Sequence, residues 1–201
     1  MEASEPNERV AGILQAACRA IGREGAQGLR VESVAREAGV SKPLVHYYFS
    51  TRRELLRAAF AYAEDRWRAR ARAELALLTS GAERLERFLL LYVGDEEDLL
   101  ENRALWNEAW SGMPLDEELA QSVKAAYRRW MDWLLELVEE GRDDGSVPAD
   151  LVPEDAVVRL TALADGLDSL LYLGLIDRVR ACDLVRQGVA LELGRAADRS
   201  R

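Results

Sequence analysis

The sequence predicts an all-α protein of about nine helices, in which a small N-terminal three-helix domain precedes a larger helical domain. Three observations support this fold class. Apolar residues recur at steps of three and four along most of the chain, which is the spacing of one helix face. No stretch beyond Gly81 alternates apolar and polar residues as a half-buried strand does. Gly, Pro, Ser and Thr stand where successive helices would begin and end.

Two helices are expected before residue 40. The first ends near Gly25 or Gly28 and carries one apolar stripe, formed by Val10, Ile13, Leu14, Ala17, Cys18 and Ile21. A short second helix repeats this spacing at Val31, Val34, Ala35 and Ala38. Gly39 then supplies the permissive backbone that a tight C-terminal turn requires.

A third, short helix is predicted to begin at Lys42. Ser41 is a favoured N-cap, and Pro43 falls in the first turn, where its missing N–H costs nothing. The helix breaks at residues 49–51, and Thr51 with Glu54 has the spacing of a capping box for the next helix. Two short helices joined by a Gly turn and packed on the first form a helix-turn-helix. The second of them can enter a DNA major groove about 12 Å wide.

The remaining helices are expected at 52–78, around 85–92, around 105–110, from 114 or 115 to about 141, at 153–173 and at 180–196. The turn region before residue 153 is rich in Gly, Asp and Pro. Pro153 can occupy the first turn of the helix that follows.

The distribution of charge distinguishes the N-terminal part. The chain carries a net charge of −9, yet residues 1–60 hold nine Lys or Arg against seven Asp or Glu, so the remainder carries −11. Within residues 41–57, four basic residues stand against Glu54 alone, with aromatic residues between them: Lys42, Arg52, Arg53 and Arg57. A polyanion binds through Lys and Arg with release of counterions. This segment therefore favours nucleic acid as a partner although the whole chain is acidic.

Membrane, metal and catalytic patterns find little support. No apolar run reaches about 18 residues, and the acidic start lacks the basic flank of a secretory signal, so we expect a cytoplasmic protein without a membrane partner. Cys18 and Cys182 lack metal-spaced neighbours and are interpreted as buried small hydrophobes. His46 is the only histidine, and neither a Gly-x-Ser-x-Gly stretch nor a metal or cofactor motif accompanies it. We therefore expect no enzyme, no metal and no cofactor. A helical enzyme with a convergent catalytic set remains a rival.

Residues 31–56, VESVAREAGVSKPLVHYYFSTRRELL, resemble the DNA-binding motif of the TetR family of bacterial transcriptional regulators. The second half is similar to the subgroup with a BetI-type C-terminal domain, in LWNEAWSGMP, YRRWMDWLLELVEEGRDDGSV and LTALADGLDSLLYLG. The resemblance implies a helix-turn-helix DNA-binding domain at 1–52 and a helical effector-binding and dimerisation domain at 53–201. The chain departs from the commonest family pattern at Arg30, Pro43, His46 and Arg52, which bears on base preference and not on the fold.

The resemblance further implies a homodimeric, ligand-responsive transcription factor, most simply a repressor that a small-molecule effector releases from double-stranded operator DNA. An effector-independent helical DNA-binding or partner-binding protein is the alternative. Phosphate contacts position such a protein and base contacts specify its site. We expect anchoring by Lys42, Tyr48 and Arg52 and base recognition by Leu44, His46 and Tyr47. The complete expected contact set is Arg30, Ser41, Lys42, Pro43, Leu44, His46, Tyr47, Tyr48 and Arg52.

Aromatic residues of the second half either fill a core or line a ligand site. Trp and Tyr walls in an acidic domain would favour a cation, and a hydrophobic effector is the other alternative. The candidate ligand residues are Trp67, Trp106, Trp110, Tyr127, Trp130 and Asp165. The resemblance also implies a dimer seam on two apolar helices near the end, in which Gly166 and Gly188 permit close approach. Its candidate residues are Leu160, Leu163, Leu167, Leu170, Leu171, Val185, Gly188 and Val189.

Overall fold

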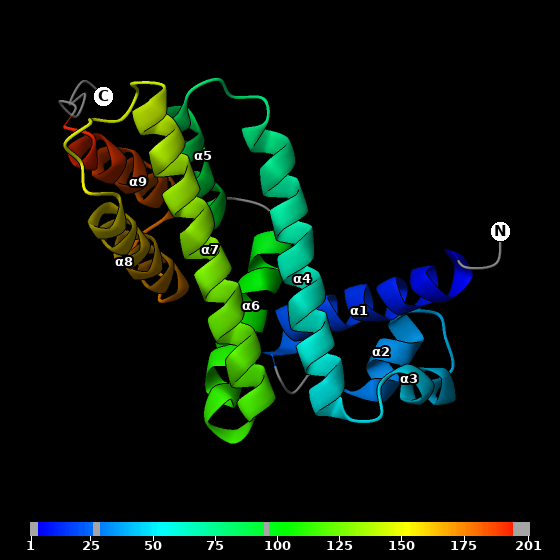
Figure 1. Ribbon diagram of the computed structural model, residues 1–201. Coiled ribbons are helices and arrows are strands. Elements are labelled where there is room, and N and C mark those ends of the chain that lie inside the picture. The colour runs from blue at the N-terminus through cyan, green and yellow to red at the C-terminus, as the bar shows by residue number, and fades with distance from the viewer. Residues whose placement is uncertain (1–3, 26–28, 95–96, 195–201) are drawn as a thin grey trace. The chain divides into compact units, whose positions relative to one another are not determined.

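The computed structural model describes residues 4–25, 29–94 and 97–194, and within them every regular element is a helix (Figure 1). The α-helices are α1 (Ser4–Glu24), α2 (Val31–Glu37), α3 (Lys42–Tyr48), α4 (Arg52–Leu75), α5 (Gly81–Val93), α6 (Glu97–Gly112), α7 (Glu117–Asp143), α8 (Pro153–Tyr172) and α9 (Arg178–Glu192). The predicted all-α class is confirmed. No described helix combines the length and the apolar character that a membrane span requires.

The helix ends follow local capping chemistry. A 3-10 turn covers Met113–Leu115, and α7 begins only at Glu117 because the Asp116 carboxylate accepts a hydrogen bond from the Leu119 N–H at 3.0 Å. The expected start at 114 or 115 was therefore too early. Asp177 caps α9 by accepting from the Arg180 N–H at 2.8 Å, so this helix starts two residues earlier than expected. Its expected end at 196 lies outside the described residues.

The chain forms two compact units. The first comprises Met1–Ala69 with Glu96–Ala126, and the second comprises Arg70–Asp95 with Tyr127–Arg201. Helices α4 and α7 each contribute residues to both units. This division reflects how the helices pack and does not test the functional boundary expected between residues 52 and 53. That boundary therefore stays a proposal.

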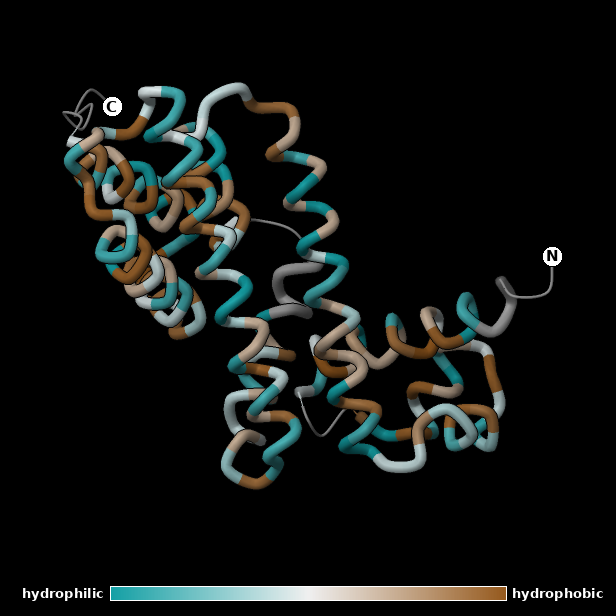
Figure 2. The backbone as a smooth tube through the Cα atoms, viewed as in Figure 1, coloured by the Kyte–Doolittle hydropathy of each residue, from teal (hydrophilic) through white to brown (hydrophobic). Residues whose placement is uncertain are grey.

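In the first unit, α1 packs against α2 and α6, and α2 packs against α3. The colour in Figure 2 alternates along these helices between hydrophobic and hydrophilic, as expected when each buries one face. The buried core includes Ile13, Ile21, Leu29, Val34, Val45, Leu55, Phe60 and Leu105. Cys18 is buried here as expected, and its thiol donates to the Ala59 carbonyl at 3.5 Å, whereas Cys182 is only half-buried.

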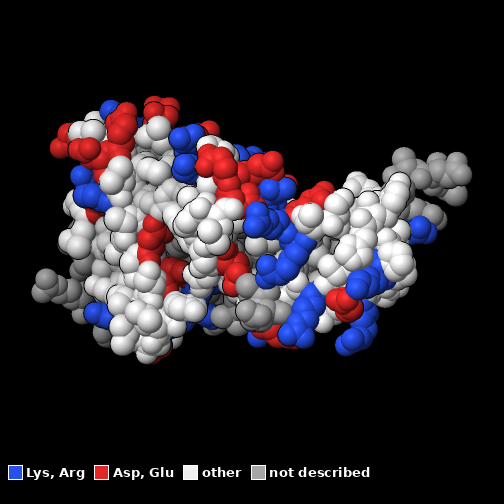
Figure 3. Space-filling view, turned by 90° about the horizontal axis from the view of Figure 1, so that it is seen from below, with Lys and Arg blue, Asp and Glu red and all other residues white. Residues whose placement is uncertain are grey.

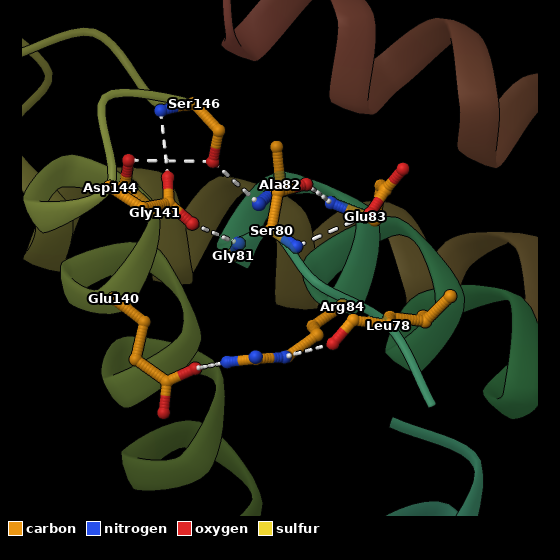
Figure 4. Close-up of polar contacts among 10 residues, drawn as sticks. All are labelled: Leu78, Ser80, Gly81, Ala82, Glu83, Arg84, Glu140, Gly141, Asp144 and Ser146. Atoms are coloured by element: carbon orange, nitrogen blue, oxygen red, sulfur yellow. Dashed lines mark hydrogen bonds and ion pairs between the residues drawn. The ribbon is translucent and has the colours of Figure 1, made fainter. Parts of the chain in front are cut away.

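In the second unit, α5 packs against α8 and α9, and the start of α5 meets the end of α7 (Figure 4). Ser80 and Glu83 form a capping box at the start of α5. Two further N–H groups of its first turn donate across to the loop after α7. That of Gly81 reaches the Asp144 carboxylate at 2.6 Å, and that of Ala82 reaches the Ser146 hydroxyl at 3.0 Å. These two hydrogen bonds satisfy N–H groups that a helix start leaves without an intrahelical partner.

Candidate nucleic-acid interface and effector residues

The seven-residue helix α3 has one face in the core and one face in solvent. Val45 and Phe49, four residues apart, are buried against the rest of the first unit. Lys42, Pro43, His46 and Tyr47 are exposed, and Tyr47 has 79% of its surface accessible. The Tyr47 ring meets the Tyr48 ring edge to face, with 5.1 Å between centroids, and still leaves most of its surface to solvent. The helix therefore presents basic and aromatic groups outward while its apolar side anchors it.

The turn between α2 and α3 fixes the orientation of α3. Gly39 has φ +67°, a left-handed conformation that residues with a Cβ rarely adopt. The Val40 N–H donates back to the Ala35 carbonyl at 2.9 Å, which closes α2 in a Schellman-type turn. Ser41 then caps α3, because its hydroxyl accepts from the Leu44 N–H at 3.3 Å. The sequence-based interpretation of Gly39 and Ser41 is thus confirmed.

The nine expected DNA-contact residues all lie in the first unit, around α3. Seven of them are exposed and Leu44 and Tyr48 are half-buried; the exposed ones are Arg30, Ser41, Lys42, Pro43, His46, Tyr47 and Arg52. Figure 3 views the molecule from below and shows Lys and Arg atoms over the part of the surface where Figure 1 places α2, α3 and the start of α4. The arrangement gives an outward-facing basic surface on a short helix.

Two of the basic groups already have partners within the chain. The Lys42 ammonium pairs with the carboxylate of Glu32, in the first turn of α2, and its hydrogen bond lowers the pKa of Glu32. The Arg52 Nε donates to the Leu29 carbonyl at 3.2 Å. Glu32 was not among the residues expected from the sequence, because no sequence pattern indicates that it contacts Lys42, ten residues later.

A second acidic residue holds α2 to α1. Glu37 accepts hydrogen bonds from Arg23 and from Arg19, each at 2.6 Å. The Arg23 hydrogen bond is the largest cause that lowers the pKa of Glu37, and the Arg19 hydrogen bond adds to it, so the pKa falls to about 2 although burial acts in the other direction. These two ion pairs hold α2, the helix that precedes α3, against α1.

Three of the candidate ligand residues belong to the first unit. The Trp106 indole N–H donates to Glu64 at 2.7 Å, and Glu64 is a buried carboxylate with 6% exposure. The Trp106 ring also meets Phe60 edge to face at 5.0 Å and Trp110 at 6.1 Å. Trp67 is half-buried. In this group the Trp106 indole N–H has its acceptor within the chain.

The other three belong to the second unit and gather around one carboxylate. Asp165, on α8, accepts hydrogen bonds from the hydroxyls of Tyr92 at 3.0 Å and of Tyr127. The Trp130 ring lies 5.5 Å from the Tyr92 ring and 6.4 Å from the Tyr127 ring, measured between centroids. Tyr92, on α5, was absent from the sequence-based set because it lies 73 residues before Asp165.

The electrostatic setting of these tyrosines is negative. Burial, followed by the carboxylates of Asp165 and Asp168, raises the pKa of Tyr92 above its ordinary value. Burial and the hydrogen bond to Asp165 likewise raise the pKa of Tyr127. Both hydroxyls therefore stay protonated and act as donors to the carboxylate at neutral pH. The described residues contain no cluster of three or more His, Cys, Asp or Glu side chains placed to hold a metal ion.

The expected dimer residues divide between the interior and the surface of α8 and α9. Leu160, Leu167, Val185 and Val189 are buried within the protomer. Leu163, Leu170, Leu171 and Gly188 are half-buried or exposed. The same helices and the turn between them expose further apolar side chains, namely Val158, Tyr172, Leu173, Leu175, Val179 and Leu191. The sequence periodicity predicted an apolar stripe on each helix. It did not predict which residues of the stripe are buried in the protomer and which are exposed.

Comparison with known proteins agrees with this geometry. Residues 13–59 match the family of bacterial regulatory proteins of the tetR type, and residues 81–194 match the C-terminal domain of BetI-type transcriptional repressors. The HTH-type transcriptional regulator BetI of Rhizobium meliloti (strain 1021) is 29% identical over 131 residues, which cover 65% of this chain and 64% of that protein. The chain thus matches less than two thirds of that relative's length.

Two solved structures are similar over most of the chain. One, from Rhodococcus sp., is described as a TetR-family transcriptional regulator; it is 31% identical, with coverage of 93% of this chain and 99% of that chain and a TM-score of 0.80. The other, a transcriptional regulator from Saccharomonospora viridis in complex with choline, is 28% identical, with coverage of 91% and 94% and a TM-score of 0.79. The protein therefore belongs to the TetR family of transcriptional regulators and carries a BetI-type C-terminal domain.

Proposed function

We propose that this regulator binds double-stranded operator DNA as a homodimer and that a small organic cation releases it, so that it acts as a repressor. The observation that carries the DNA-binding part is the division of α3 into a buried apolar face and an exposed face with Lys42, His46 and Tyr47. A helix of this kind can enter the major groove while its buried side keeps its orientation. The proposed contact set is the nine residues expected from the sequence.

Salt dependence tests the phosphate contact that we assign to Lys42. The chain has two lysines, Lys42 and Lys124, and both side chains are exposed. Operator fragments selected from genomic DNA would be titrated with wild-type protein, Lys42→Gln and Lys124→Gln by fluorescence anisotropy at several salt concentrations. We expect Lys42→Gln to weaken binding to every duplex and to reduce the salt slope by about 1. The Lys124→Gln control loses the same charge and should bind as wild type.

Covalent labelling gives an independent measurement on the unaltered protein. An amine-reactive reagent modifies both lysines in free protein, and bound duplex should protect Lys42 while Lys124 stays reactive. Equal modification of Lys42 with and without saturating DNA, together with an unchanged salt slope in Lys42→Gln, would remove Lys42 from the interface.

The dimer is supported by apolar surface that the protomer leaves exposed on α8 and α9. Leu191 and Val179 have 71% and 73% of their surface accessible. Burial of such side chains against a second copy yields about 25 cal/mol for each Å² of apolar surface. Two helices from each subunit would then form a four-helix contact. Dimerisation also fits DNA recognition, because two recognition helices about 34–36 Å apart can read successive major-groove faces.

Analytical ultracentrifugation tests the dimer seam with a matched pair of variants. Leu191→Asp puts a charge into the proposed seam, whereas Leu77→Asp makes the same change at a residue with 82% exposure in the connection after α4. We expect Leu191→Asp to shift the protein toward monomer and Leu77→Asp to leave the dimer intact. A dimer that tolerates Leu191→Asp and Val179→Asp alike would place the seam elsewhere.

The cationic effector is supported by the similar protein that was solved with choline and by the aromatic and acidic residues of the second unit. An effector releases the operator only if it binds the DNA-incompetent state more tightly than the DNA-bound state. Titration of the protein–operator complex with choline should therefore lower the bound fraction. Operator binding that ignores choline and other organic cations would favour the effector-independent alternative.

A further inference from the structure

We propose that Tyr92, Tyr127, Trp130 and Asp165 form the effector-recognition site and that it selects an organic cation which also carries a hydrogen-bond-accepting oxygen. This inference rests on the proposed cationic effector and specifies where it binds and which second group it must contain. It depends on two independent features of the second unit: among the described residues, one carboxylate has no ion pair and one buried indole N–H has no acceptor.

The carboxylate of Asp165 has hydrogen bonds and, within the described part of the chain, no ion pair. It accepts from two tyrosine hydroxyls, and among the described residues no Lys or Arg side chain pairs with it. A half-buried carboxylate in this position is favoured by a positive charge that neutral hydroxyls cannot supply. Asp168, three residues later on α8, adds negative potential at Tyr92. The negative potential of these carboxylates therefore favours binding of a cation.

The rings beside Asp165 determine the kind of cation. Tyr92 and Tyr127 each contact both Asp165 and the Trp130 ring. Ring faces carry negative potential and attract a cation that comes within about 6 Å of the ring centroid. An alkylated ammonium gains both this attraction and contact with apolar ring surface, because its charge is spread over carbon-bound hydrogens. A compact, strongly hydrated ammonium would lose more hydration there.

The second feature is the Trp130 indole N–H. Its Nε1 atom is buried and has no hydrogen-bond partner among the described residues. Buried N–H groups in native proteins are nearly always paired, so one that is left alone marks a missing acceptor. In the first unit the equivalent group of Trp106 donates to Glu64 at 2.7 Å. The two indoles thus differ: that of Trp130 has no acceptor among the described residues, and we assign this role to an oxygen of the ligand.

Three probes separate the charge from the oxygen. Choline has both groups, ethyltrimethylammonium lacks the hydroxyl, and 3,3-dimethylbutan-1-ol replaces the charged nitrogen with carbon. Isothermal titration of the full-length protein should show choline binding about tenfold more tightly than ethyltrimethylammonium, the worth of one buried hydrogen bond. The neutral alcohol should bind more weakly than either cation. These comparisons on the wild-type protein need no variant.

Variants then assign the two contributions to residues. Trp130→Phe keeps an aromatic ring and removes the N–H, so the affinity ratio between choline and ethyltrimethylammonium should fall from about tenfold to about one. Asp165→Asn should weaken both cations at least tenfold and leave the neutral alcohol unchanged. Trp106→Phe is the matched control, because it removes an indole N–H that already has an acceptor, and it should keep the wild-type ratio. Circular dichroism verifies that each variant is folded.

The outcomes distinguish this inference from the proposed function. A choline preference that survives in Trp130→Phe, or that disappears in Trp106→Phe, would overturn the assignment of the oxygen contact to Trp130 while the cationic effector stands. Equal binding of the neutral alcohol and choline would overturn the role of Asp165. Failure of both cations to bind wild-type protein would overturn the cationic effector and this site together, whereas DNA binding is judged by its own titrations.

Discussion

Replacement of Gly81 with alanine sets two effects against each other, and the structure decides which prevails. Gly81 is the first residue of α5, and a Cβ at this position would lie 2.2 Å from the Gly141 nitrogen and 2.3 Å from its Cα. These are backbone atoms and cannot rotate aside. Ordinary contact requires about 3.5–4.0 Å, so α5 and the end of α7 would have to separate by more than about 1 Å.

The magnitude follows from what this separation disturbs. Overpacking of this kind costs about 1–3 kcal/mol. The same movement lengthens the 3.0 Å hydrogen bond from the Ala82 N–H to the Ser146 hydroxyl, which contributes about 1 kcal/mol (Figure 4). The better helix propensity of alanine offsets only about 0.5–1 kcal/mol. We therefore expect Gly81→Ala to lower the free energy of unfolding by about 2 kcal/mol, and for a chain of this size the melting temperature by about 4–8 °C.

Urea denaturation followed by far-ultraviolet circular dichroism, at one fixed protein concentration, measures this change. Gly12→Ala is the matched control, because Gly12 lies inside α1 and a Cβ there would meet no atom within 4 Å. That substitution should stabilise the protein by about 0.5–1 kcal/mol. The close contact between Gly81 and Gly141 would be refuted if Gly81→Ala were as stable as wild type or more so while Gly12→Ala behaved as expected.

Three further changes have defined outcomes. Glu37→Gln should lower the free energy of unfolding by about 1–2 kcal/mol at pH 7. The expected loss is kept this small because Arg23 is half-exposed and solvent screens its charge. Because the pKa of Glu37 is lowered from 4.5 to about 2 in the folded protein, the stability difference between variant and wild type should shrink as pH falls from 4.5 to 2. Urea titrations at several pH values measure this difference, and a constant value would contradict the assigned ion pairs. Glu32→Gln frees Lys42 and should raise affinity for any duplex about twofold to fivefold at low salt, which anisotropy titration measures, and an unchanged affinity would show that the ion pair does not compete with DNA. Ser80→Ala removes one half of the capping box and should lower the unfolding free energy by about 1 kcal/mol, whereas an unaltered urea midpoint would mean that water replaces the hydroxyl.

The sequence by itself determined the helices and the DNA-binding motif. The turn at Gly39 and the cap at Ser41 both depend on residues within a few positions of one another. Helical hydrogen bonds join residues four apart, so the information that places a helix is local. For the same reason the outward face of α3, with Lys42 and Tyr47, could be predicted before the structure was known.

Only the tertiary structure decided which distant groups meet. Tyr92 joins Asp165 across 73 residues, and Glu64 meets Trp106 across 42. The apolar stripe of α8 was evident in the sequence, but burial of Leu160 and exposure of Leu191 on its neighbour α9 depend on which helices pack against each other. Periodicity gives the direction of a helix face and not its partner, since any apolar face can be buried against any other of matching shape. The candidate effector site is a product of such packing, whereas the DNA-binding helix is a product of local sequence.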